Sequence, residues 1–119
     1  MVNKNVLLDR SVEFAVKIVK LVQSLHEEQK DALLAREIFK SGTKIGARLR
    51  EAEHSENLEH FVDCLQRAHS KAIQVDFHLE LAYRVDIINQ ETNDSLKREA
   101  SLLRKMIEAN IKAAKQKIK

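Results

Sequence analysis

Apolar residues recur along this chain at intervals of three and four positions, in four separate segments. In the first segment these positions are Phe14, Ala15, Ile18, Leu21, Val22 and Leu25. This spacing places them on one side of a helix and leaves the other side polar. Asp9 or Ser11 carries a side-chain oxygen that can cap the start of this helix. The polar run 26–30 interrupts the pattern and predicts a short connection.

The second segment contains both glycines of the chain. Asp31 can cap this helix, whose apolar positions are Leu34, Ile38, Ile45, Leu49 and Ala52. Gly42 and Gly46 are four residues apart and therefore share a face. Each costs roughly 1 kcal/mol relative to alanine inside a helix. We expect a neighbouring helix, of the same subunit or another, to approach closely there; the alternative is a kink or break at residues 41–43.

The third segment is the longest. A polar turn at residues 51–56 precedes it, with Ser55 as the expected cap. Apolar positions then recur from Leu58 to Tyr83 without a helix-breaking residue, which predicts a helix over residues 55–89. At 1.5 Å per residue such a helix spans about 50 Å, so we expect it to bend or to overhang the other helices.

The fourth segment follows a polar connection at residues 89–94, where Thr92 or Asn93 is the expected cap. Its apolar positions are Leu96, Ala100, Leu103, Ile107, Ile111, Ala114 and Ile118. Asn110 lies at the edge of this stripe. It has two interpretations: a buried amide that fixes register or partner choice, or an edge amide that contacts water.

Four amphipathic segments joined by short links predict an all-α fold, an antiparallel up-down-up-down four-helix bundle formed as a single domain by residues 1–119. Further apolar positions are too numerous for one core: Leu7, Leu8, Leu33, Phe39, Ile73, Phe77, Leu81, Val85, Ile87, Ile88 and Leu102. They indicate a second buried face and hence a homo-oligomer.

The composition supports this interpretation. A chain of 119 residues can bury a shared core without disulfides or a metal. Two glycines, no proline and 33% charged residues are typical of long amphipathic helices. The lone Cys64 cannot form an internal disulfide, and no apolar run approaches the length of a membrane span. We therefore expect a cytoplasmic protein without a membrane segment.

Basic residues are distributed unevenly. Residues 93–119 carry eight basic and three acidic side chains, which indicates either an anion or nucleic-acid contact or a solvated helix end that complements its own dipole. On the second helix, Arg36, Lys40, Lys44 and Arg48 form an i, i+4 ridge. Either Glu37, Glu51 or acidic residues of a neighbouring helix neutralise this ridge, or it contacts phosphates.

The candidate nucleic-acid-binding residues are Arg36, Lys40, Lys44, Arg48, Arg50, Lys105, Lys112 and Lys115. Aromatic residues make up only 4% of the chain, and most of them are expected in the core. Such binding should therefore follow the nucleic-acid backbone and discriminate poorly between sequences.

Residues 41–52 read SGTKIGARLREA. This segment resembles the SGTSIGANIxEA-type segment of the four helix bundle protein family, first noticed as reading frames inside intervening sequences of bacterial 23S ribosomal RNA genes. The flanking segments FAVKIVKLVQSL, LLAREIF and ENLEHFVDCLQRAHSKA fit the resemblance as well, so it covers essentially the whole chain.

The resemblance implies an up-down-up-down bundle that assembles into a ring-like homopentamer with no established enzyme activity. A similar fold serves as the accessory protein of diversity-generating retroelements, where the pentamer engages nucleic acid and a reverse transcriptase. The chain departs from the family pattern at Lys44, Arg48, Arg50, Lys71, Gln74 and His78. If the family residues there form a polar cluster, this chain has rebuilt it with more positive charge.

Patterns typical of enzymes are missing from the sequence. There is no GxSxG, phosphate-loop or GxGxxG pattern, and no HExxH or CxxC spacing. His60 and Cys64 form the only i, i+4 pair of soft metal ligands, whereas a metal site needs three or four. We therefore expect no catalytic site, metal, cofactor or small-molecule substrate. The sequence predicts a non-enzymatic homo-oligomer with an accessory nucleic-acid role, or alternatively a scaffold that binds only proteins.

Overall fold

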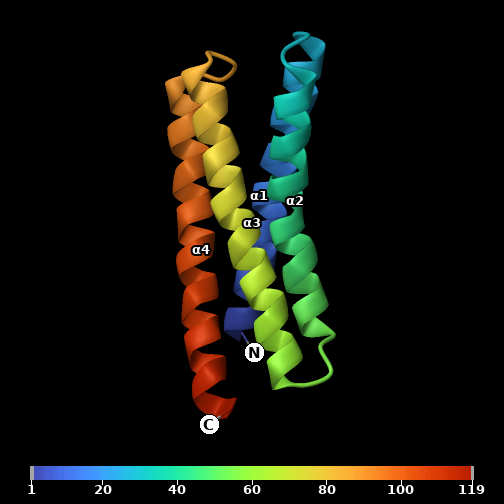
Figure 1. The fold of residues 1–119 in the computed structure, drawn as a ribbon, viewed down its shortest axis with the longest axis vertical. Helices are drawn as coiled ribbons and strands as arrows, with labels where there is room; N and C mark the ends of the chain where they lie inside the picture. The colour runs from blue at the N-terminus through green and yellow to red at the C-terminus, as the bar shows by residue number, and fades with distance from the viewer. Residues whose placement is uncertain (1, 119) are drawn as a thin grey trace.

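Four long helices run up and down along one axis and form an elongated bundle of 50 × 22 × 21 Å (Figure 1). The computed structural model describes residues 2–118, with the side chains of residues 6–118. The helices are α1 (Val2–Glu27), α2 (Ala32–Glu53), α3 (Leu58–Arg84) and α4 (Gln90–Ile118). Each helix packs on its two neighbours, whereas no Cα atoms of the diagonal pairs α1–α3 and α2–α4 lie within 8 Å of each other. The predicted antiparallel four-helix bundle is confirmed.

The core consists of the apolar stripes that the sequence predicts. Its largest fully buried side chains are Phe14, Ile18, Leu25, Ile38, Ile45, Leu65, Val75, Leu79, Leu103 and Ile107. A buried leucine or isoleucine stabilises the fold by about 1.5–3 kcal/mol relative to an exposed one, so these stripes hold the helices together. The fourth stripe weakens toward its end, where Ile111 is half-buried and Ile118 is exposed.

Side-chain caps fix the starts of three helices. Asp31 accepts a hydrogen bond from the Leu34 N–H at 3.0 Å, which confirms the predicted cap of α2. The expected cap of α3, Ser55, is wrong: Asn57 accepts from the His60 N–H at 2.8 Å instead. The reason is the turn after α2, where the His54 N–H still bonds to the last turn of that helix.

The start of α4 also differs from the expectation. Asn89 accepts from the Thr92 N–H at 2.8 Å, so neither Thr92 nor Asn93 is the cap. Asn93 lies inside the helix and is buried. The polar run 89–94 is therefore mostly the first turn of a helix.

The first helix begins earlier than the sequence indicates. It starts at Val2 rather than at Asp9 or Ser11. Ser11 is fully buried and donates a hydrogen bond to the Leu8 carbonyl at 2.6 Å, so it caps nothing. Leu7 is buried in the core, and this packing stabilises the part of α1 that precedes Asp9.

The third helix ends five residues earlier than predicted. It has 27 residues, or about 40 Å, so the expected overhang is not needed. Asp86 adopts a left-handed conformation with φ of 64°, and the Ile87 N–H bonds to the Ala82 carbonyl at 2.8 Å. This arrangement closes the helix end without glycine. The end of α1 is similar, with φ of 56° at Gln29.

The two glycines make room for α1. A Cβ atom on Gly42 would lie 2.8 Å from Ile18 Cγ1, and one on Gly46 would lie 3.2 Å from Ser11 Oγ. The close approach predicted for this face is thus made by α1 of the same chain. The alternative of a break at residues 41–43 is wrong, because α2 is continuous there.

The surplus apolar residues divide into two groups. Leu7 and Ile88 join the core, and Leu8 and Ile87 pack half-buried against it. The others are exposed: Leu33, Phe39, Ile73, Phe77, Leu81, Val85 and Leu102. Asn110 is half-buried and donates to the Met106 carbonyl at 2.9 Å, which fits the interpretation as an edge amide.

Candidate interaction surfaces

The four basic residues of the α2 ridge point in progressively different directions around the helix axis. Successive i, i+4 residues are displaced by about 40° around the helix axis. Arg36, Lys40 and Lys44 are consequently exposed, whereas Arg48 is half-buried. Arg48 lies near the thiol of Cys64 and therefore faces α3. The ridge is not a straight row on one surface.

Carboxylates of α2 neutralise part of this ridge. Arg48 lies 3.0 Å from Glu51. Lys40 lies 4.0 Å from Glu37, and Arg50 lies 3.9 Å from Glu53. Among the side chains of residues 6–118, Arg36 and Lys44 have no carboxylate partner within 4.0 Å. Exposed pairs of this kind contribute at most about 1 kcal/mol, so Lys40 and Arg50 remain available for other contacts.

A polar cluster joins the middle of α2 to α3. Nδ1 of His78 lies 3.0 Å from the Ser41 hydroxyl, which donates to the Glu37 carbonyl at 2.8 Å. Burial lowers the pKa of His78, and nearby Glu37 opposes that effect. Lys71 donates to the side chain of Gln74 at 3.1 Å. Ser41 is only 2% exposed and His78 is half-buried, so this serine and histidine form a contact between two helices.

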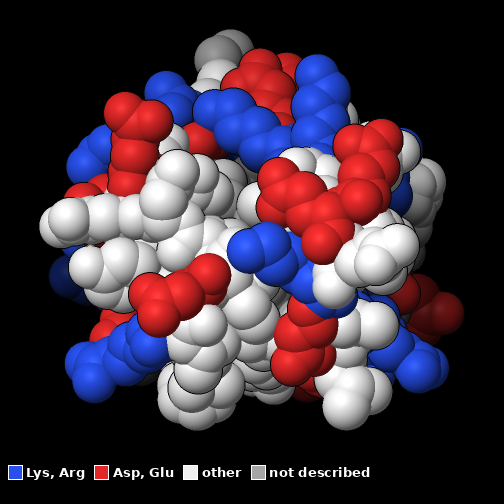
Figure 2. Space-filling model, turned by 90° about the horizontal axis from the view of Figure 1, so that it is seen from above, with Lys and Arg blue, Asp and Glu red and all other residues white. Residues whose placement is uncertain are grey.

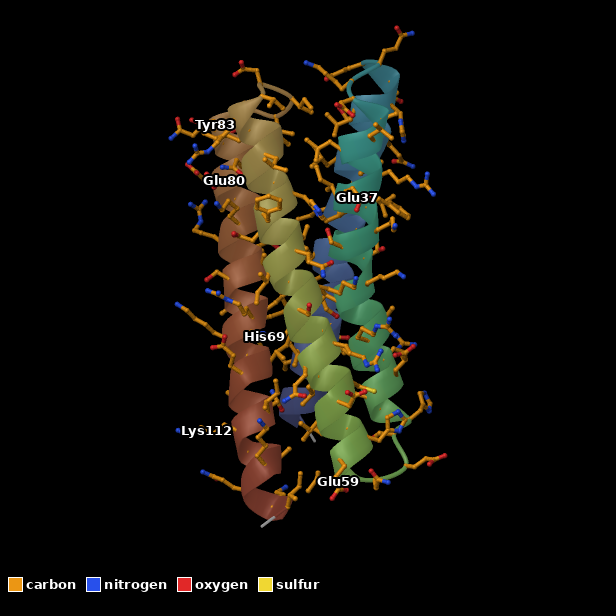
Figure 3. The ribbon with its side chains drawn as sticks, in the orientation of Figure 1. Glu37, Glu59, His69, Glu80, Tyr83 and Lys112 are labelled. Atoms are coloured by element: carbon orange, nitrogen blue, oxygen red, sulfur yellow. The ribbon has the colours of Figure 1, made fainter. Side chains whose placement is uncertain are left out.

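The lysines of α4 lie away from the α2 ridge, because α2 and α4 occupy diagonal corners of the bundle. Lys112 projects outward from α4 (Figure 3). Lys112 and Lys115 line a groove of about 560 Å³ between α3 and α4. Across it, His69 Nε2 lies 2.7 Å from Glu108, and this hydrogen bond lowers the pKa of Glu108. The eight predicted residues therefore do not form one surface.

A larger groove between the same helices carries balanced charge. Its volume is about 820 Å³, and it lies near Glu80 and Tyr83, toward the end of α3 (Figure 3). Lys97 and Arg84 donate to Glu80 at 2.5 and 2.8 Å, and these hydrogen bonds lower the pKa of the Glu80 carboxyl. The Lys97–Glu80 pair ties α4 to α3, whereas Arg84 and Glu80 belong to the same helix. Acidic and basic side chains also intermingle over the nearby end of the bundle (Figure 2).

Two exposed faces of the bundle are apolar. One lies on α1 and α2, where Val12, Val16 and Phe39 are exposed. Phe39 precedes Gly42 by three residues and so lies beside the contact between α1 and α2. The other face is a ridge on α3 formed by Ile73, Phe77 and Leu81, with Phe77 57% exposed. The helix α3 lies in front and α1 behind in Figure 1, so the two faces point in different directions.

This arrangement occurs in known proteins. The sequence model described as 23S rRNA-intervening sequence protein matches residues 3–109. The chain belongs to this family. It is also similar to a crystal structure from Bacteroides thetaiotaomicron, a protein with unknown function from the S23 ribosomal protein family. The two are 36% identical, with a TM-score of 0.90, and the match covers 92% of this chain and 98% of the other. No curated protein matches the chain.

In this member of the 23S rRNA-intervening sequence protein family, the chemical groups to consider among the described residues are metal ligands and a reactive thiol. No three histidine, cysteine, aspartate or glutamate side chains among them gather as a metal site would require. Cys64 is buried, and burial raises the pKa of its thiol, which makes it a poor nucleophile. No helix among residues 2–118 is both long and apolar enough to cross a membrane.

Sequence reasoning singled out Phe39 and the three residues of the α3 ridge, but neither Val12 nor Val16, and it did not group these residues into faces. Ile73, Phe77 and Leu81 follow an i, i+4 spacing that predicts the ridge on α3. Val12 and Val16 carry no comparable signal, because they alternate with the core positions of the same helix. Only the packing of α1 on α2 shows that these valines remain exposed beside Phe39.

Proposed function

We propose that this family member is a non-catalytic assembly module, whose copies join into a ring-like homo-oligomer through the two exposed apolar faces. The observation that carries the proposal is the exposure of Val12, Val16 and Phe39 on one face and of Ile73, Phe77 and Leu81 on the other. Exposed apolar patches on soluble proteins commonly mark interaction sites. The family resemblance adds the expectation of five subunits.

The difference between the two faces determines the symmetry. A twofold dimer needs one face that pairs with itself, whereas two different faces that pair with each other repeat head to tail. A head-to-tail contact closes into a ring when the rotation that relates neighbouring copies is a whole fraction of 360°. The α3 ridge of one copy would pack on the α1–α2 face of the next.

Light scattering of purified protein at micromolar concentration tests the assembly. The expected result is a mass several times that of the 13.7 kDa chain. Phe77→Glu should reduce the mass to that of a monomer, because it buries a charge in the interface. Gln116→Glu, a change at an exposed position of α4 outside both faces, serves as the charge control and should leave the mass unchanged. A monomeric wild-type protein would exclude self-assembly.

Mixing two variants tests the head-to-tail arrangement. Phe77→Glu retains an intact α1–α2 face, and Val16→Glu retains an intact α3 ridge. Each variant alone should be monomeric, while an equimolar mixture should give heterodimers that grow no further. If either variant alone still forms dimers, then a face pairs with itself and the ring arrangement is wrong.

A second function, accessory nucleic-acid binding, has one specific observation in its favour. Arg36 and Lys44 are exposed and have no carboxylate within ion-pair distance among residues 6–118. A ring would repeat Arg36 and Lys44 once in each subunit, so that several weak contacts to nucleic acid act together and raise the overall affinity. Labelled RNA and DNA should then bind with an affinity that falls as salt rises, and the variant Arg36→Ala, Lys44→Ala should bind more weakly. Absence of binding at low salt would exclude this role.

A further inference from the structure

A third apolar strip lies along the outside of α4, beside α1. Leu102 and Ala109 are exposed and Met106 is half-buried, and the strip continues to Ala113. The spacing of four, three and four residues places the four side chains on one helical face. Met106 also packs against the edge of the core. None of the four residues belongs to the two apolar faces of the proposed assembly.

The strip forms the floor of a groove. Together with Val6 of α1, the side chains Met106, Ala109 and Ala113 line a depression of about 290 Å³ between the two helices. Asn110 also lines it, with its amide donating to the Met106 carbonyl of its own helix. Farther along the seam, Lys17 pairs with Glu99 at 2.7 Å and closes the space between α1 and α4. Among the side chains that the structure describes, the groove is therefore mainly apolar and is bounded at one end by this ion pair.

A row of basic residues flanks the groove. Arg98, Lys105 and Lys112 are exposed and seven residues apart, so they run parallel to the strip. None of the three forms an ion pair within the part of the chain whose side chains are described. Their charges are free to pair with a ligand that covers the apolar floor.

We propose that this groove binds an acidic amphipathic helix of another protein. Such a helix would place its apolar residues on Leu102 and Met106 and carboxylates against the basic row. The strip from Leu102 to Ala113 is about 17 Å long, which corresponds to three turns of the bound helix. Acidic residues at seven-residue spacing would face Arg98, Lys105 and Lys112. The proposal is independent of the self-assembly proposed above.

Two other occupants fit less well. Nucleic acid would satisfy the basic row but would leave the apolar floor uncovered, and the groove has no aromatic side chain on which a base could stack. In a second copy, the carboxylates nearest the apolar ridge of α3 are the half-buried Asp76 and Glu80. Both already lie beside Lys97 of the same chain, at 3.9 and 2.5 Å.

Peptide binding to the full chain tests the proposal. The probe is a labelled helical peptide with leucine on one face and glutamate beside it, compared with the same peptide carrying lysine in place of glutamate. Fluorescence anisotropy should show binding of the acidic peptide and at least tenfold weaker binding of the basic one. Equal affinities, or no binding of the acidic peptide, would overturn the proposal.

Variants locate the binding site. The double variant Ala109→Gln, Ala113→Gln fills the groove without changing its charge. The double variant Lys105→Glu, Lys112→Glu reverses the charge of two residues of the basic row. Each pair should weaken binding of the acidic peptide at least tenfold, and the charge reversal should favour the basic peptide. Ala47→Gln and Lys44→Glu make the same changes on exposed positions of α2 and should have no effect. Circular dichroism checks that every variant remains helical.

Two further results would contradict the proposal. If the groove-filling variant changes the mass of the assembly instead of peptide binding, a second copy occupies the groove. If RNA displaces the acidic peptide and the charge reversal abolishes RNA binding while groove filling does not, the basic row is a nucleic-acid contact. Retention of the wild-type mass, together with loss of peptide binding in both variants, supports an acidic helix as the ligand.

Discussion

The Ser41 hydroxyl of α2 lies 3.0 Å from Nδ1 of His78 in α3. Because the hydroxyl proton is directed to the Glu37 carbonyl, 2.8 Å away, Nδ1 of the neutral imidazole must carry the proton of this contact. Ser41 thus accepts from the neighbouring helix and donates to its own. The contact connects the middle of α2 to the last third of α3 with a hydrogen bond.

Ser41→Ala should lower the free energy of unfolding by about 1–3 kcal/mol, because it leaves the Nδ1 proton of His78 without a partner. Urea denaturation measures the change. Ser70→Ala, on the exposed side of α3, is the matched control and should change stability by less than about 0.5 kcal/mol. Equal stability of the two variants would indicate that the contact contributes nothing.

Stability should fall as the pH drops below about 6.5, the ordinary pKa of histidine. Burial lowers the pKa of His78 in the folded chain, so the unfolded chain binds more protons between the two pKa values. The loss begins near the unfolded value and levels off below the folded one. Denaturation at a series of pH values should show this slope, and His78→Gln should reduce it.

The carboxylates act in a different pH range. Hydrogen bonds hold the pKa values of Glu80 and Glu108 below 4.5, so their stabilisation is lost only when the pH falls below that value. The interval between pH 6.5 and 4.5 therefore reports on histidine. An unchanged slope in His78→Gln would assign the pH dependence to another residue.

Gly42→Ala should destabilise the protein, although alanine normally favours a helix by roughly 1 kcal/mol over glycine. The new Cβ would lie 2.8 and 2.9 Å from two carbons of Ile18, which is too close for unstrained packing. Overpacking of this kind costs about 1–3 kcal/mol. Gly46→Ala meets Ser11 at 3.2 Å and should change stability less. Ile18→Ala removes both of the Ile18 carbons, so the loss in the double variant Gly42→Ala, Ile18→Ala should be smaller than the sum of the two single losses in thermal denaturation.

The caps provide a test of the corrected boundary between α2 and α3. Asn57→Ala should cost about 0.5–2 kcal/mol, because Asn57 accepts the His60 N–H at the start of α3. Ser55→Ala should cost little, since the Ser55 side chain forms none of the hydrogen bonds of that cap. Chemical denaturation of the two variants compares them directly. A larger loss in Ser55→Ala would restore Ser55 as the cap.

Gln29→Gly should raise the melting temperature by about 2–5 °C. Gln29 has φ of 56°, a left-handed conformation that costs most residues roughly 1–2 kcal/mol and glycine almost nothing. The flexibility of glycine in the unfolded chain offsets part of this gain. Asp86→Gly at φ of 64° should gain less, because aspartate tolerates the conformation better. A lower melting temperature for Gln29→Gly would contradict the argument.

The bundle could be predicted from the sequence because its stripes are regular. Ile38, Ile45 and Leu49 lie where helical spacing places a buried face, and all three are buried. Helix ends were harder to predict. Ile87 and Ile88 continue the apolar pattern of α3 past its end, so the pattern does not indicate the turn there. The turn is recognised in the structure by the hydrogen bond from the Ile87 N–H to the Ala82 carbonyl. Ser11 has the chemistry of a cap but lies against Gly46.

The candidate surfaces were less predictable than the fold. Spacing alone places Arg36 and Arg48 in one row, but the helix turns Arg48 toward α3, and Glu51 pairs with it at 3.0 Å. The groove beside Leu102 depends on how closely α1 approaches α4. That separation follows from the packing of all four helices and has no local signal in the sequence.

The up-down order brings the first turn of α1, the last turn of α4 and the link between α2 and α3 to the same end of the bundle (Figure 1). A fluorescent protein fused to either end of the chain would therefore mark the same pole. In a head-to-tail ring all copies share one orientation, and such labels would crowd a single rim. The opposite rim, with the α1–α2 and α3–α4 links, would stay clear for electron microscopy with bound antibody fragments.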